Sequence, residues 1–107
     1  MEFNEITNQI KDFSTSKLEF KTLFFSNAIA GEVGEYCNLV KKFYRDIKYN
    51  SETIAHNQYL KLRSNIRKEL ADIFIYLVLN AKNWSINLEF AILDKIKEVN
   101  KRSVKKE

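Results

Sequence analysis

The chain has 107 residues and a mass of 12.7 kDa, enough for one domain with a single core. Hydrophobic residues make up 45% of it and charged residues 30%, while the absence of Pro and the presence of only two Gly exclude a turn-rich all-β fold, a glycine-rich dinucleotide fingerprint and a Walker-type phosphate loop. The formal net charge is +4, and because twelve cationic and twelve acidic residues precede residue 95, the whole excess lies in residues 95–107.

The spacing of apolar residues predicts helices from the N-terminus onwards, within one domain covering residues 1–107. A first amphipathic helix is expected over about residues 3–13, ending near residues 14–16, which are Ser-Thr-Ser and typical of helix ends. A second helix is expected over about residues 18–47. Its apolar positions recur every three or four residues: Ile29, Val33, Tyr36, Val40, Phe43 and Ile47.

Two further helices follow a loop predicted at residues 48–53. The third, over about residues 54–84, has the expected buried stripe Tyr59, Leu62, Ile66, Leu70, Ile73, Leu77, Ala81 and Trp84. Residues 70–79 are apolar almost all round, which predicts burial on more than one side, as at a subunit interface. Asn87 is expected to cap a fourth helix over about residues 88–103, with inward positions Leu88, Ile92, Ile96 and Val99. The prediction is an all-α, four-helix bundle-like fold completed by oligomerisation.

The cysteine and histidine content limits compartment and chemistry. One Cys cannot close an intrachain disulfide, and one Cys with one His cannot build a zinc ribbon or a histidine-rich zinc site. The N-terminal residues do not resemble a signal peptide, and the apolar run 70–79 is shorter than the roughly 20 residues of a membrane span. We therefore expect a cytoplasmic protein with no membrane partner. Cys37 is expected to be a small buried hydrophobe and His56 a surface residue.

Two carboxylate pairs of equal spacing are the main candidates for a site: Glu32 with Glu35 on the second helix, and Glu69 with Asp72 on the third. Residues three apart lie on one side of a helix, so each pair can present two carboxylates to one point. Glu2 and Glu5 have the same spacing, so solvated surface carboxylates are the alternative. Asp72, however, is the only charged residue among residues 70–79, and a carboxylate in apolar surroundings needs a partner or a metal ion.

Four converging carboxylates would form an oxygen-only cation site, which selects Mg²⁺, with Mn²⁺ as a possible substitute. Gly31 and Gly34 adjoin Glu32 and Glu35, where each costs about 1 kcal/mol relative to Ala, a cost that close approach of a ligand would explain. From the residues alone, a metal site and structural ion pairs remain open alternatives. Three side chains share the flanks of the pairs and are candidates for substrate contact: Asn38, Lys42 and Tyr76.

Residues 30–42, Ala-Gly-Glu-Val-Gly-Glu-Tyr-Cys-Asn-Leu-Val-Lys-Lys, followed by residues 69–77, Glu-Leu-Ala-Asp-Ile-Phe-Ile-Tyr-Leu, resemble the MazG-like all-α nucleoside triphosphate pyrophosphohydrolases. The resemblance extends over residues 18–103. It implies that Glu32, Glu35, Glu69 and Asp72 hold Mg²⁺ and serve catalysis. The last helix resembles the closing segment of that family, which implies that Lys95, Asn100 and Arg102 address the substrate phosphates.

The resemblance implies hydrolysis of nucleoside triphosphates, deoxynucleoside triphosphates in particular, between the α and β phosphates, to give the monophosphate and pyrophosphate for cleaning of the nucleotide pool. It also implies a homodimer or a homotetramer. Phosphoribosyl-ATP and deoxyuridine-nucleotide hydrolases share the carboxylate pattern and remain alternatives. The non-enzymatic alternative is a small basic helical module that binds nucleic acid through its last helix. We do not expect a nucleic-acid partner, because the cations gather at one end of a neutral chain rather than on a wide basic face.

Overall fold

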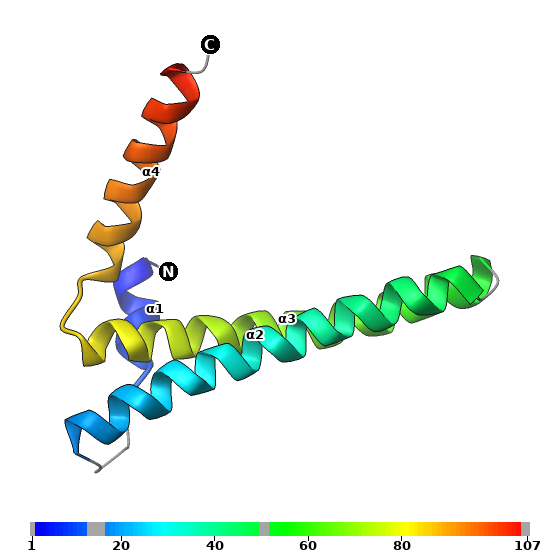
Figure 1. Cartoon of the computed structure of the whole chain (residues 1–107), viewed down its shortest axis with the longest axis horizontal. Helices are drawn as coiled ribbons and strands as arrows, with labels where there is room; N and C mark the ends of the chain where they lie inside the picture. Colours follow the sequence, from blue (N-terminus) through cyan, green and yellow to red (C-terminus); the bar gives the residue numbers. More distant parts are fainter. Residues whose placement is uncertain (1, 13–16, 50–51, 106–107) are drawn as a thin grey trace.

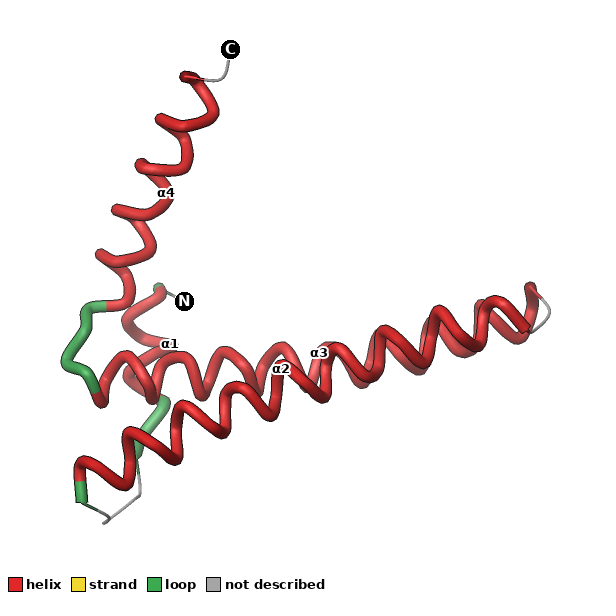
Figure 2. The backbone as a smooth tube through the Cα atoms, viewed as in Figure 1, coloured by secondary structure: helices red, strands yellow, loops and turns green. Residues whose placement is uncertain are grey.

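In a computed structural model the chain is built of helices, and the residues it describes, 2–12, 17–49 and 52–105, contain no β-strand. The helices are α1 (Phe3–Gln9), α2 (Leu18–Tyr49), α3 (Glu52–Asn83) and α4 (Leu88–Lys105). α2 and α3 form a long antiparallel hairpin, α1 lies beside the end where α2 begins and α3 ends, and α4 extends away from that same end (Figure 1; Figure 2). The predicted all-α fold class is confirmed.

The helix bounds differ from the prediction mainly at the two loops. α2 continues to Tyr49 and α3 begins at Glu52, so the predicted loop 48–53 is wrong at both of its ends, and residues 50–51 lie outside the described residues. No Pro or Gly stands in that segment to end either helix earlier. α1 ends at Gln9 instead of residue 13, and the predicted interruption at residues 14–16 lies outside the described residues.

The most buried apolar side chains gather where α1 meets the hairpin. Phe25 of α2 is 4% exposed, and Val78, Leu79 and Ala81 of α3 are 2%, 9% and 8% exposed. Two asparagine side chains of α3 hold α2 in register there. Asn80 Nδ2 donates hydrogen bonds to the Phe25 and Tyr76 carbonyl oxygens, at 3.0 and 2.7 Å. Asn83 Nδ2 donates to Thr22 Oγ1 at 2.8 Å.

α1 is attached to the end of α3 by one ring contact and one cation. The rings of Phe3 and Phe74 meet edge to face with centroids 6.2 Å apart. Lys82 Nζ donates hydrogen bonds to the carbonyl oxygens of Thr7 at 2.8 Å and Ile10 at 2.7 Å. Because the last carbonyls of a helix have no partner within it, the Lys82 ammonium satisfies the C-terminal end of α1.

The connection from α3 to α4 is a Schellman motif. The Ile86 N–H donates to the Ala81 carbonyl at 2.9 Å, and the Ser85 N–H donates to the Lys82 carbonyl at 3.1 Å. Ser85 stands at the left-handed position with φ 56°, where Gly is the usual residue. Asn87 then caps α4, as its position in the sequence predicts: its Oδ1 accepts the Phe90 N–H at 3.0 Å.

Several side chains expected to be buried are exposed in the single chain. Tyr59, Leu70, Leu77 and Trp84 of α3 are between 38% and 62% exposed. Five of the ten predicted inward positions on α2 and α4 are also exposed, at 37% to 50%: Val33, Ile47, Ile92, Ile96 and Val99. The prediction was wrong for one chain because each helix of a two-helix hairpin covers only one stripe of its neighbour.

Cys37 is also exposed, contrary to the prediction, because it lies about 140° around α2 from Glu32, which faces α3. His56 is exposed, as expected. No described helix combines the length and the apolarity that a membrane crossing requires.

Candidate metal centre

Three of the four predicted carboxylates meet between the helices near the middle of the hairpin. Glu32 and Glu35 come from α2 and Glu69 comes from α3, and one oxygen of each lies within 4.8 Å of the others. Glu32 and Glu35 converge because residues three apart on a helix share a side, and Glu69 meets them because α3 runs antiparallel to α2 at this level. We call these three residues the carboxylate triad.

Two oxygen atoms of the carboxylate triad are buried without a partner. Glu32 Oε2 and Glu69 Oε2 are inaccessible to solvent and accept no hydrogen bond from the described residues. Glu35 is exposed at the mouth of the site. A buried ionised oxygen is costly unless a proton or a cation compensates it, so the arrangement favours a bound cation.

The pKa of Glu69 is raised above the ordinary glutamate value. The largest cause is the neighbouring Glu32 carboxylate, to which a protonated Glu69 can donate a hydrogen bond, and burial is the second cause. A hydrogen bond with Glu35 opposes the shift, whereas the charges of Glu32 and Asp72 add to it. The triad therefore attracts positive charge, either a proton or a metal ion.

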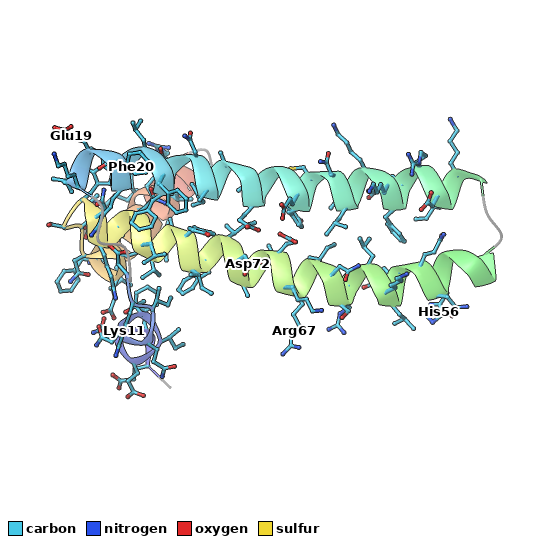
Figure 3. All side chains as sticks on the ribbon, turned by 90° about the horizontal axis from the view of Figure 1, so that it is seen from below. Lys11, Glu19, Phe20, His56, Arg67 and Asp72 are labelled. Carbon is cyan, nitrogen blue, oxygen red and sulfur yellow. The ribbon has the colours of Figure 1, made fainter. Side chains whose placement is uncertain are left out.

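Asp72, the fourth predicted carboxylate, lies outside the carboxylate triad. It is exposed, one turn along α3 from Glu69, and it acts on Glu69 through its charge. Figure 3 shows Asp72 near the middle of α3 and far from His56, which lies toward the other end of the helix. Asp72 is thus close to the triad along the chain without sharing its meeting point.

The remaining predicted site residues fall into two groups. Asn38 and Lys42 are exposed on α2, and Tyr76 is half-buried on α3, all on helices that form the triad. Lys95, Asn100 and Arg102 are exposed on α4, which extends away from the hairpin (Figure 1). Glu98 pairs with two of these α4 residues: with Lys95 at 3.3 Å and with Arg102. A single chain therefore does not bring the α4 residues to the carboxylate triad.

The two glycines beside the triad meet no close neighbour in this chain. A Cβ atom added to Gly31 or Gly34 would find no heavy atom within 4 Å outside its own helix. Their use inside a helix is not explained by packing among the described residues, although each lowers helix stability by about 1 kcal/mol relative to Ala.

A hollow of about 290 Å³ lies between α2 and α3, one turn from the triad toward residues 49 and 52. Its lining includes Lys42 among the predicted site residues and Phe43 and Leu62 among the predicted apolar positions. The other lining residues are ones that the sequence analysis did not single out: Leu39, Asp46, Gln58, Lys61 and Asn65. Residues 58, 62, 65 and 69 are spaced by four, three and four residues, so they lie on one face of α3. The sequence feature that could have predicted the hollow is this continuation of the face of Glu69 toward the start of α3.

The donor set of the triad fits a hard divalent cation. Its ligand atoms are all carboxylate oxygens, two of which lack any other partner, and no nitrogen or sulfur ligand accompanies them among the described residues. Such sets prefer Mg²⁺, Ca²⁺ or Mn²⁺ over softer metals. The fold and the triad together define a helical protein with a carboxylate cluster that fits a divalent cation.

The sequence model of the MazG nucleotide pyrophosphohydrolase domain matches residues 20–106. The chain belongs to this family and is a nucleotide pyrophosphohydrolase, a hydrolase that acts on phosphoric anhydrides of nucleotides. Enzymes of the family depend in general on a divalent metal ion, and the carboxylate triad fits that requirement. Comparisons with curated proteins and with solved structures give no significant match.

Proposed function

We propose that the chain hydrolyses nucleoside triphosphates, deoxynucleoside triphosphates in particular, between the α and β phosphates, with Mg²⁺ as the metal ion. The products are the monophosphate and pyrophosphate. The observation that carries this proposal is the carboxylate triad, with its two unpartnered buried oxygens, in a chain of this family. We expect Mn²⁺ to replace Mg²⁺, because both ions take carboxylate oxygen ligands.

Each carboxylate has a distinct proposed role. Glu32, Glu35 and Glu69 would hold the metal ion, Glu32 and Glu69 through their buried oxygens. Asp72, one turn along α3, would add negative charge and would become a further ligand if its side chain turned toward the triad. The bound metal ion supplies neutralisation of phosphate charge and a lowered pKa of water. Glu35 is exposed at the mouth of the site, where it can accept the proton of the water that attacks the α-phosphorus. Lys42 and Asn38, on the same flank of α2, would contact the phosphates or the sugar.

The active unit is proposed to be an oligomer, because one chain is far from compact. The chain exposes 8889 Å² of surface, whereas a compact monomer of 12.7 kDa exposes about 6,200 Å². Its radius of gyration is 18.1 Å, against about 13 Å for a compact domain of this length. The excess surface is large enough for an extensive interface with a second copy.

Part of the exposed apolar surface lies on the side of the hairpin away from the site. Successive residues of a helix are rotated by about 100°, so the side of the hairpin on which each residue lies follows from its number. Glu35 of α2 and Asp72 of α3 lie on one side of the antiparallel pair. Four exposed apolar side chains lie on the opposite side: Val33, Ile47, Leu70 and Leu77. Pairing of two hairpins through this side would leave the carboxylate triad accessible. The exposed stripe of α4 offers a second contact surface, so a homodimer or a homotetramer is proposed, with Lys95, Asn100 and Arg102 supplied to the phosphates by a neighbouring copy.

We propose a place in cleaning of the cytoplasmic nucleotide pool, with residues 1–107 acting as one domain. This follows from the proposed reaction, because pyrophosphate release is effectively irreversible once pyrophosphate is removed and withdraws the triphosphate from use.

The experiment is product analysis by chromatography after incubation with a panel of ribonucleoside and deoxyribonucleoside triphosphates, with Mg²⁺ and with a chelator. We expect monophosphate and pyrophosphate only with Mg²⁺. Glu35→Gln and Asp72→Asn should lower the rate by about 100-fold or more, and Glu5→Gln, an exposed carboxylate on α1, serves as the matched control. Absence of turnover with every nucleotide would contradict the proposal, and full activity of both variants would contradict the assigned roles.

A further inference from the structure

The hollow beside the carboxylate triad combines apolar walls with an unpartnered polar atom. Leu39, Phe43 and Leu62 line it, and the Phe43 ring packs against Tyr59 with centroids 5.9 Å apart. Gln58 Oε1 is buried and accepts no hydrogen bond from the described residues. A buried amide oxygen without a donor is rare in folded proteins and indicates a missing partner.

The chemistry of this lining distinguishes between the parts of a nucleotide. A phosphate group at neutral pH offers only acceptors, so it cannot satisfy Gln58 Oε1, and apolar walls do not compensate its charge. A planar base can lie against Phe43 and Leu62 and can donate an N–H from its edge. The part of the hollow around Gln58, Phe43 and Leu62 therefore suits a base, whereas Lys42 and Lys61 suit the phosphates.

The position of the hollow agrees with this assignment. The lining of the hollow begins at Asn65, four residues before Glu69 on α3, and ends at Gln58, eleven residues before it, so the hollow extends from about 6 Å to about 16 Å from the triad along the helix axis. Ribose and base extend from the α-phosphate over this kind of distance. Lys42 and Lys61 line the hollow between Gln58 and the triad and are exposed, so they are available to the sugar and phosphates.

The acceptor on Gln58 favours one class of base. Asp46 also lines the hollow and pairs with Arg45, with its Oδ1 3.6 Å from Arg45 Nε. Because Gln58 Oε1 needs a donor and the Asp46 carboxylate adds negative charge, the hollow favours bases with an exocyclic amino group over bases that carry a carbonyl there. Cytosine and adenine have an amino group at the position where uracil and hypoxanthine have a carbonyl.

We propose that this hollow is the base subsite and that Gln58 selects amino-bearing bases by accepting their N–H. The proposal rests on the proposed nucleotide hydrolysis and assigns its specificity to a residue outside the carboxylate triad. Asn65, one turn before Glu69, supplies a second amide on the same wall.

The test compares paired substrates, dCTP with dUTP and ATP with ITP, in the wild type and in Gln58→Met, which keeps the side-chain length and removes the acceptor. The wild type should prefer the amino-bearing member by about tenfold or more in kcat/KM, and the variant should lose the preference through KM with kcat little changed. Gln58→Glu keeps the acceptor and should keep the preference. Asn57→Leu, which changes an exposed neighbouring amide, is the matched control.

A binding measurement separates failure of this inference from failure of the proposed reaction. If the wild type hydrolyses no nucleotide, the reaction fails, and the subsite is then judged by NMR with cytidine, uridine and inorganic pyrophosphate as probes. We expect cytidine to shift the side-chain amide resonances of Gln58 and Asn65 more than uridine does. The inference is overturned if Gln58→Met keeps the wild-type preference, if cytidine leaves these resonances unchanged, or if pyrophosphate alone shifts them.

Discussion

Binding of Mg²⁺ or Mn²⁺ to the metal-free protein should raise its melting temperature, because the carboxylate triad holds negative charge that the fold alone does not compensate. Glu32 Oε2 and Glu69 Oε2 are buried without partners, and the pKa of Glu69 is raised by Glu32, by burial and by Asp72. A ligand at a hundredfold excess over its Kd stabilises the folded state by about 2.7 kcal/mol. For a domain of this size the melting temperature should then rise by about 10 °C or more.

The sign of the pH dependence follows from the raised pKa. A raised pKa means that folded Glu69 binds a proton more tightly than the unfolded chain does. The resulting contribution to the free energy of unfolding is fully present below the ordinary glutamate pKa and is lost as the pH rises through the raised value. The metal-free protein should therefore lose this contribution on going from acidic to neutral pH, and saturating Mg²⁺ should restore stability at neutral pH. Glu69→Gln should weaken the pH dependence.

The assay is differential scanning fluorimetry or calorimetry at fixed protein concentration, with metal ion and with chelator. Glu69→Gln should melt no lower than the wild type without metal, because it removes like-charge repulsion, yet it should lose most of the metal-induced increase. Glu5→Gln on α1 is the matched control and should respond as the wild type does. An unchanged melting temperature in millimolar Mg²⁺ and Mn²⁺, or an equal response of Glu69→Gln, would refute the reasoning about the triad.

Three further predictions concern the fold and assembly. Leu77→Glu places a charge on the apolar side of the hairpin and should shift the protein toward monomer, as measured by light scattering. Lys61→Glu, on the other side, is the control and should leave the mass unchanged. Equal masses for both variants would argue against pairing of hairpins through the apolar side. Ser85→Gly relieves the left-handed φ of 56° and should stabilise the protein by about 0.5–1 kcal/mol in urea unfolding, and a destabilised variant would contradict this account of the turn. Lys82→Met removes both hydrogen bonds to the end of α1 and should cost about 1–3 kcal/mol, with faster amide exchange confined to residues 3–10; unchanged exchange there would mean that the Phe3–Phe74 contact holds α1 alone.

Local sequence features predicted the helices well because they depend on neighbouring residues. The three- and four-residue apolar spacing, the absence of Pro and the Asn87 cap all act within one or two turns, and the helices and the Asn87 cap are confirmed. The end of α3 was predicted at about residue 84 and lies at Asn83, although the Schellman turn there uses Ser85 at a position where Gly is the usual signal. The metal site was predictable as two pairs of carboxylates, because spacing by three residues sets the side of a helix.

Contacts between helices could not be derived in the same way. Which carboxylates meet depends on the relative positions of α2 and α3 along their axes, and the hydrogen bonds of Asn80 and Asn83 to α2 hold that register. In this register Glu69 joins Glu32 and Glu35, while Asp72 stays outside. The hollow with Gln58 arises from the same pairing. Side-chain spacing repeats along one helix, but it carries no information on the offset of a second one.

The sequence by itself thus determined the all-α class, the family and the candidate ligands, because helical periodicity and short motifs are local properties. The tertiary structure decided that three carboxylates converge, that Cys37 and the stripe of α4 face solvent in one chain, and that Lys95 and Arg102 lie away from the site. The physical reason is that burial and convergence depend on which helices are adjacent. In this chain α3 has α2 along its length and α1 at one end, whereas α4 has an apolar face without a partner among the described residues.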